Sequence, residues 1–150
     1  MSFQEQESYL DRLNSGTLNE DYCLESLSDS VDFGFFWAGP KADTSPMLRR
    51  TQLPVRFYLI KHDNKYCSIV YDVDASDLQV FTKVECRKNN ITFKALDEVI
   101  LPHLKLNRTH QIVSTKIGNS EARNLLKKLG FRESHQEGDT LFYTFDFAGS

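Results

Sequence analysis

The sequence has little cysteine, no excess of positive charge and no long apolar run. Its three cysteines, Cys23, Cys67 and Cys86, are odd in number and lack CxxC spacing, so neither a disulfide framework nor a metal site is predicted. A net charge of −3 offers nucleic-acid phosphates no broad cationic field, so general nucleic-acid binding is not expected. No apolar run approaches the ~20 residues of a membrane helix. We therefore expect a soluble, unexported protein in a reducing cytoplasm.

The length and the apolar content suit one domain. The chain has 150 residues, of which 40% are hydrophobic, with eleven Phe and six Tyr to fill a core. We find no internal repeat and no low-complexity tract. The expectation is a single domain over residues 1–150, divided into a variable N-terminal part (1–54) and a core (55–150).

The N-terminal part mixes helical and strand patterns. From Gln4 to about Ser30 apolar residues recur at helical spacing, with a break at residues 14–16, which predicts two short helices. The aromatic and β-branched stretch over 31–37 predicts a first strand. Residues 41–54 show no periodicity and predict a loop.

The first half of the core predicts strands. Three stretches rich in β-branched and aromatic residues, over 55–61, 66–73 and 78–84, are separated by two polar turns. Such stretches with short polar connections are typical of an antiparallel meander.

The second half of the core alternates helices with strands. Apolar residues at helical spacing predict a helix from about Phe93, and Pro102 marks its end or a kink near it. A short strand over 110–115, a helix capped by Asn119 and closed by Gly130, and a strand over 140–147 follow. The order β-β-β-α-β-α-β predicts an α+β fold with a mixed central sheet flanked by helices.

The helix after Asn119 resembles the signature helix of the GNAT superfamily of N-acetyltransferases. The residues that match the family pattern are Asn119, Ala122, Leu125, Lys128, Gly130 and Phe131. Leu126 stands where the family commonly has a tyrosine. An ordinary capped amphipathic helix followed by a strand would show the same cap, apolar face and glycine. The resemblance implies a GNAT-like fold over about two thirds of the chain.

A second family motif matches in part. The resemblance implies that a loop of the form Arg/Gln-x-x-Gly-x-Gly/Ala binds the pyrophosphate of acetyl-coenzyme A, and the corresponding residues are Arg87, Lys88, Asn90, Ile91 and Thr92. Both small positions are replaced. Asn90 is a residue type that tolerates the left-handed conformation. The branched side chain of Thr92 would crowd the pyrophosphate, or its hydroxyl would cap the helix or donate to a phosphate oxygen. The loop is therefore either a weakened coenzyme site or one that no longer binds coenzyme A.

The resemblance also implies a reaction, the transfer of an acetyl or acyl group to an amine on a small molecule or a protein. Glu85 is the first candidate for the general base, ahead of Asp72 and Asp74, and the alternative role for Glu85 is a solvated charge beside a lysine. Asn119 is expected to contact the pantetheine arm or the split of the sheet. Leu126 cannot donate a proton to the departing thiolate.

Other side chains have alternative roles that the sequence leaves open. Tyr143 and Tyr71 are the replacement proton donors, with a half-buried place in the sheet as the alternative for Tyr143. Cys86 is followed by two basic residues and a helix start, which are neighbours that can make a thiol reactive. We nevertheless expect it to be a small buried residue at the end of a strand.

A weaker resemblance concerns short GNAT-like proteins of tailed bacteriophages. The stretches that carry it are Gly118-Asn119-Ser120, the run from Leu126 to Gly130, and Leu141-Phe142-Tyr143. This resemblance implies a second possibility, a catalytically lapsed GNAT fold that binds a protein partner as a structural or assembly module. The expected location is then a bacterial or phage-infected cytoplasm, or the virion itself.

Overall fold

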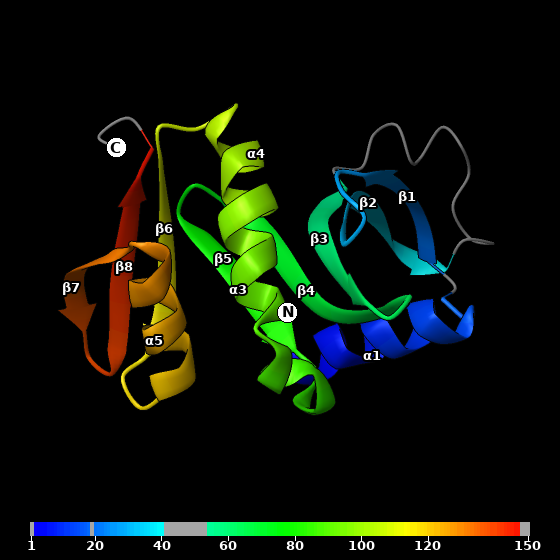
Figure 1. Ribbon diagram of the computed structural model, residues 1–150, viewed down its shortest axis with the longest axis horizontal. Coiled ribbons are helices and arrows are strands. Elements are labelled where there is room, and N and C mark those ends of the chain that lie inside the picture. Colours follow the sequence, from blue (N-terminus) through cyan, green and yellow to red (C-terminus); the bar gives the residue numbers. More distant parts are fainter. Residues whose placement is uncertain (1, 19, 41–53, 148–150) are drawn as a thin grey trace. The chain divides into compact units, whose positions relative to one another are not determined.

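The computed structural model describes residues 2–18, 20–40 and 54–147 (Figure 1). The chain folds as two compact units. The first comprises residues 1–72 and 80–92, and the second comprises residues 73–79 and 93–150. The single domain expected over 1–150 stays a prediction. Residues 41–53 of the loop predicted over 41–54 lie outside the described residues. Among the described residues no helix is both long and apolar enough to cross a membrane.

The first unit is built around a sheet with the strand order β1-β2-β3-β4-β5, of which the end of β4 and the start of β5 (within residues 73–79) belong to the second unit. Its elements are α1 (Phe3–Ser15), β1 (Glu20–Ser26), β2 (Val31–Pro40), β3 (Val55–His62), β4 (Lys65–Asp74) and β5 (Asp77–Thr82). The neighbouring strands from β1 to β4 pair antiparallel. The predicted meander and the predicted strand at 31–37 are thus confirmed.

The second predicted N-terminal helix is wrong, because residues 20–26 form β1. Its spacing of apolar residues suits a helix, but pairing with β2 decides the outcome, since Tyr22 lies opposite Phe36 and stacks on its ring at 5.4 Å. Leu24 lies opposite Gly34, where an added Cβ would collide with the Leu24 side chain and with the Cys23 carbonyl. Glycine is therefore required at position 34 for the two strands to approach.

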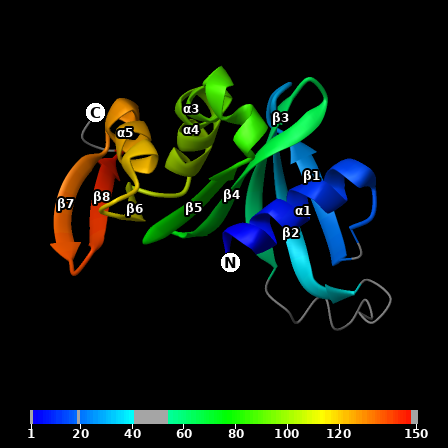
Figure 2. The same ribbon diagram turned by 90° about the horizontal axis from the view of Figure 1, so that it is seen from below.

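The core of the first unit lies between α1 and one face of the sheet (Figure 2). It consists of Leu10, Phe36, Phe57, Leu59, Ile69 and Phe81. The helix begins where the Ser2 hydroxyl accepts the Glu5 N–H and ends at Gly16, whose φ of 72° is left-handed. Tyr9 packs on two core rings, with its ring centroid 5.7 Å from that of Phe36. The helix predicted from Gln4 is therefore confirmed, and its apolar face is what the core buries.

Two helical stretches follow β5, separated by the non-helical Asn90. The first is η2 (Val84–Asn89), and the second consists of α3 (Ile91–Ala95), the π-helical η3 (Leu96–Ile100) and α4 (Leu101–Lys105). Pro102 was expected to end or kink the helix, and the helix in fact continues through it. Because proline lacks an N–H and crowds the preceding turn, the helix widens just before it, and Leu101 donates to Leu96 in a π-type bond.

The second unit holds a sheet with the order β6-β8-β7, covered by α5 (Figure 1). The elements are β6 (His110–Lys116), α5 (Ser120–Leu129), β7 (Arg132–Glu137) and β8 (Thr140–Asp146). The strands pair antiparallel, and β7 was not predicted because all six of its residues are exposed and show no apolar alternation. It is only the pairing with β8 that makes β7 a strand.

The start of β5 meets β6 within the second unit. Ile112 N–H donates to the Ala75 carbonyl at 2.8 Å, and Ser114 N–H donates to Asp77 Oδ1 at 3.0 Å. These two bonds attach β6 to the turn before β5 and to the first residue of β5. The predicted α+β fold is confirmed, with its strands in two sheets.

Candidate functional site

The Arg87–Thr92 turn connects η2 with α3. Asn90 ends η2 with φ 56° and ψ 17°, so the left-handed conformation that the sequence allowed is the one adopted. A left-handed residue after a helical one directs successive backbone N–H groups to one side and forms a concavity for anions. The helical stretch over 91–105 begins at the next residue and adds the positive end of its dipole. The turn therefore has the backbone shape that glycine commonly provides in phosphate-binding loops.

The side chain of Thr92 points into the first unit. Its hydroxyl lies 2.7 Å from the Ser68 hydroxyl and 2.8 Å from the Thr82 hydroxyl, and these two are 2.7 Å apart. Ser68 is fully buried and Thr92 is 9% exposed. The crowding that we expected from this branched residue does not arise at the surface of the turn, because the branch is enclosed. Any contact of Thr92 with a ligand is left to its backbone.

The charged residues of the turn lie at its exposed end. Arg87 is exposed and its Nε donates to the Thr82 carbonyl at 3.0 Å, which ties the guanidinium to the end of β5. Ile91 is half-buried. The side chain of Lys88 lies outside the described residues.

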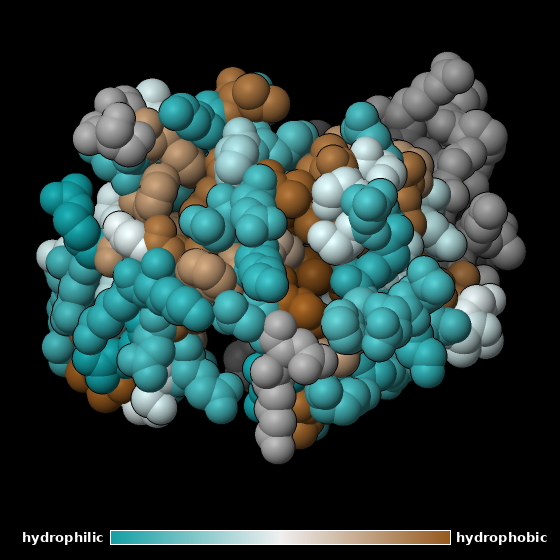
Figure 3. Space-filling view, in the orientation of Figure 1, coloured by the Kyte–Doolittle hydropathy of each residue, from teal (hydrophilic) through white to brown (hydrophobic). Residues whose placement is uncertain are grey.

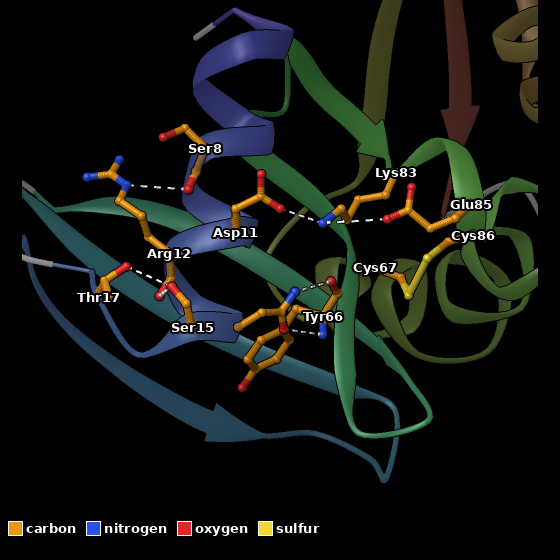
Figure 4. A network of polar contacts seen from close by, with 11 residues as sticks. Ser8, Asp11, Arg12, Ser15, Thr17, Tyr66, Cys67, Lys83, Glu85 and Cys86 are labelled. Carbon is orange, nitrogen blue, oxygen red and sulfur yellow. Dashed lines mark hydrogen bonds and ion pairs between the residues drawn. A yellow bond between two sulfur atoms is a disulfide. The ribbon is translucent and has the colours of Figure 1, made fainter.

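Glu85 lies on η2 and is 68% exposed at its side chain (Figure 4). Its Oε1 is 3.6 Å from Lys83 Nζ, and the same Nζ bonds Asp11 of α1. The hydrogen bond that Lys83 donates to Asp11 raises the pKa of Lys83, so this lysine holds its charge between the two carboxylates. The surroundings of Glu85 thus match the alternative to a general base, which is a solvated charge beside a lysine.

The cysteines contradict the sequence-based expectation, since Cys67 and Cys86 form a disulfide. The two residues are 19 apart in the sequence, but β4 and η2 bring their Cα atoms to 5.9 Å, a common separation for a disulfide. No spacing rule reveals a pairing made by tertiary structure. Cys86 is 7% exposed, as expected for a small buried residue, and Cys23 is an exposed free thiol.

The signature helix lies in the second unit and matches its predicted local roles. Asn119 caps α5, with its Oδ1 accepting the Ala122 N–H at 3.1 Å. Leu126 is 6% exposed and packs inward. Tyr143, a proposed proton donor, is fully buried, and its hydroxyl is 3.4 Å from Arg123 Nε. Tyr71 is the other proposed proton donor, and the centroid of its ring lies 5.2 Å from that of Phe57.

The acidic residues near the β4–β5 turn have different environments. Asp72 is buried and forms an ion pair with Arg56 at 3.4 Å, and Asp74 accepts the Ser76 N–H at 2.7 Å. Asp77 accepts both the N–H and the hydroxyl of Ser114, and burial raises the pKa of its carboxyl. Sequence reasoning missed Asp77, because only the long-range meeting of β5 with β6 encloses it.

Among the described residues, five large apolar side chains are exposed. Large exposed apolar side chains are scattered over separate elements, namely Tyr22, Val73, Val84, Leu106 and Ile117. Hydrophilic residues predominate over α1 and α5 in the face seen in Figure 3. No group of three or more His, Cys, Asp or Glu among the described residues is arranged to hold a metal ion.

Comparison with known proteins identifies the fold. No protein-family model and no curated protein matches the sequence. Among solved structures, a probable acetyltransferase superposes with a TM-score of 0.61 at 11% identity, over 85% of this chain and 99% of that one. A GNAT-family acetyltransferase from Bacillus anthracis gives 0.52 at 9% identity, over 63% and 66%.

A third similar structure contains ligands. The spermidine N-acetyltransferase from Vibrio cholerae, solved with CoA and spermine, gives a TM-score of 0.53 at 14% identity, over 63% of this chain and 66% of that one. The chain thus spans just under two thirds of the Bacillus and Vibrio proteins. These likenesses show that it has the fold of the GNAT acetyltransferases, as the sequence predicted.

Proposed function

We propose that this protein is a coenzyme A-dependent N-acyltransferase that transfers an acetyl or related acyl group to an amine. The observation that carries the proposal is the left-handed Asn90 immediately before the helix over 91–105. It provides a backbone concavity for a pyrophosphate although both glycines of the family motif are replaced. The GNAT fold supports the same function.

The residues of the turn fit a pyrophosphate. Backbone N–H groups at Asn90, Ile91 and Thr92 would hold its oxygens, and the exposed guanidinium of Arg87 would bind from the side. Lys88 would add a second positive charge to the segment. The buried Thr92 side chain keeps its bulk out of the way. Bound acetyl-coenzyme A would supply the acyl thioester for the transfer.

The family resemblance supplies two further candidate residues, Asn119 and Glu85. Asn119 would contact the pantetheine arm through its backbone, because its side chain caps α5. Glu85 is the first carboxylate to test as general base, and because it is exposed beside Lys83 we expect the test to exclude it. The acceptor is proposed to be an amine, the class to which the spermine of the Vibrio cholerae complex belongs.

Calorimetric titration with acetyl-coenzyme A and with free coenzyme A tests the proposal, at moderate salt so that bare phosphate attraction is damped. We expect saturable micromolar binding. Asn90→Gly should keep the affinity because glycine adopts positive φ at no cost. Asn90→Val should lower it at least about tenfold, because a β-branched residue is strained in that conformation by roughly 1–2 kcal/mol.

The matched control is Asn64→Val. Asn64 is also left-handed, with φ 65°, but it lies in the β3–β4 turn. This substitution should cost similar stability and leave the coenzyme affinity unchanged. If both valine variants weaken binding equally, the loss reflects general destabilisation and the turn is not the site.

The second candidate is the lapsed GNAT fold that binds a protein partner. The observation that favours it is Leu126, which is buried where the family commonly has a tyrosine. No heat with either ligand up to millimolar concentration would support this candidate. Where binding is found, release of the free thiol in the presence of polyamines or peptide N-termini separates an active transferase from a coenzyme-binding module.

A further inference from the structure

The Arg87–Thr92 turn and the η2 residues before it are attached to two consecutive residues of β4. Ser68 bonds Thr82, where the connection leaves β5, and also bonds Thr92, where it enters α3. Cys67 holds the middle of the connection through the disulfide to Cys86. Noncovalent bonds therefore hold both ends, and the middle is held by the disulfide together with the hydrogen bond from Arg87 Nε to the Thr82 carbonyl.

Further contacts hold the region next to the disulfide (Figure 4). Lys83 N–H donates to the Cys67 carbonyl at 2.9 Å, and the Lys83 ammonium bonds Asp11 of α1. These contacts position the start of η2 whether or not the sulfurs are joined. The residues after Cys86, up to the left-handed Asn90, depend most on the disulfide because they lie between the covalent link and the hydroxyl bonds of Thr92.

We propose that the Cys67–Cys86 disulfide is a redox-controlled clamp on the Arg87–Thr92 turn. When it is oxidised, the turn keeps the conformation of Asn90 described above. When it is reduced, the segment from 85 to 90 becomes mobile while its two ends stay attached. In a reducing compartment disulfides are usually transient and redox-responsive rather than permanent, so the state of this one would follow its surroundings.

The reductant is a dithiol, and the exchange conserves atoms and electrons. Because both cysteines are buried, a local opening must first expose the sulfur. One thiolate of the dithiol then attacks Sγ of Cys86, the S–S bond breaks, and Cys67 leaves as a thiolate that takes up a proton. The second thiol then attacks the reductant's own sulfur in the mixed disulfide and releases Cys86 as a thiol. The protein gains two electrons and two protons, and the dithiol becomes a disulfide.

The clamp has a consequence for ligand binding that rests on the proposed function. A mobile turn must be ordered again when the pyrophosphate binds, and this ordering reduces the affinity. The reduced protein should therefore bind acetyl-coenzyme A at least about tenfold more weakly than the oxidised protein.

The experiment compares oxidised and dithiothreitol-reduced protein in a Cys23→Ser background, which removes the free thiol and prevents exchange with it. Amide hydrogen exchange is read over residues 84–91, with β6 and β8 as internal references. We expect exchange over 84–91 to rise at least about tenfold on reduction, without change in β6 and β8, and to return on reoxidation. The double variant Cys67→Ser, Cys86→Ser should match the reduced protein. If this variant does not fold, reversible reduction gives the same answer.

Three results would overturn the clamp. The first is a count of three free thiols in the natural sequence purified under air, and the second is an exchange rate over 84–91 that stays within about twofold on reduction. The third is a loss of protection that extends through β2 to β4, because the disulfide would then be a general cross-link. Acetyl-coenzyme A titration of both forms is read separately. If neither form binds, the proposed function fails while hydrogen exchange still decides the clamp. If both bind equally although the turn loosens, the proposed control of binding is wrong.

Discussion

Replacing Thr92 by valine separates a structural role from a ligand-binding one. Valine has the same shape as threonine but no hydroxyl, so it removes the hydrogen bonds of 2.7 and 2.8 Å to Ser68 and Thr82. Each net hydrogen bond is worth about 0.5–1.5 kcal/mol, and the two remaining hydroxyls still bond each other. The free energy of unfolding should therefore fall by about 1–3 kcal/mol.

Urea unfolding measures this loss, and acetyl-coenzyme A titration is done on the same variant. Because the hydroxyl points into the first unit, affinity should change less than about threefold under conditions where the variant is folded. Thr92→Ser keeps the hydroxyl and should recover most of the stability. Thr109→Val, at an exposed threonine, is the control and should cost less than about 0.5 kcal/mol. Unchanged stability with a tenfold loss of affinity would refute the buried hydroxyl cluster.

Three more predictions concern single side chains. Tyr66→Phe removes a 2.7 Å bond to the buried Asp32 carboxylate and should cost about 1.5–3 kcal/mol in urea unfolding, and a loss below about 0.5 kcal/mol would contradict the bond. Burial raises the pKa of Asp77 above its usual 3.8, so the folded state binds that proton more tightly than the unfolded state. The stability of the natural protein relative to Asp77→Asn should therefore fall as pH rises from about 4 to 7, and a rise would reverse the assigned sign. Glu85→Gln should leave turnover within about twofold, since Glu85 is exposed beside Lys83, whereas a tenfold loss would make Glu85 the base.

Local signals predicted much of the fold. The strands of the meander alternate or are continuously apolar, and the helix after Asn119 carries its own cap and its closing glycine, so both could be read from neighbouring residues. The strand β1 could not, because Tyr22 and Leu24 fit helical spacing and only their pairing with β2 decides against a helix. The strand β7 has no buried face, so its sequence carries no pattern to read.

The candidate site was predicted at the level of the backbone and less well at the level of side chains. The tolerance of Asn for positive φ is an intrinsic property, and Asn90 shows it. The inward direction of Thr92, the disulfide of Cys86 and the burial of Asp77 each depend on a residue far away in the sequence. No local pattern encodes these three contacts, so they could be found only in the structure.

The central claim is that the Arg87–Thr92 turn binds the pyrophosphate of coenzyme A through its backbone. The most direct measurement is an amide NMR titration of the oxidised protein with acetyl-coenzyme A. The account predicts saturable shifts that are largest at the N–H groups of residues 90–92. An absence of shifts up to millimolar ligand, or saturable shifts that leave the turn unaffected, would contradict it.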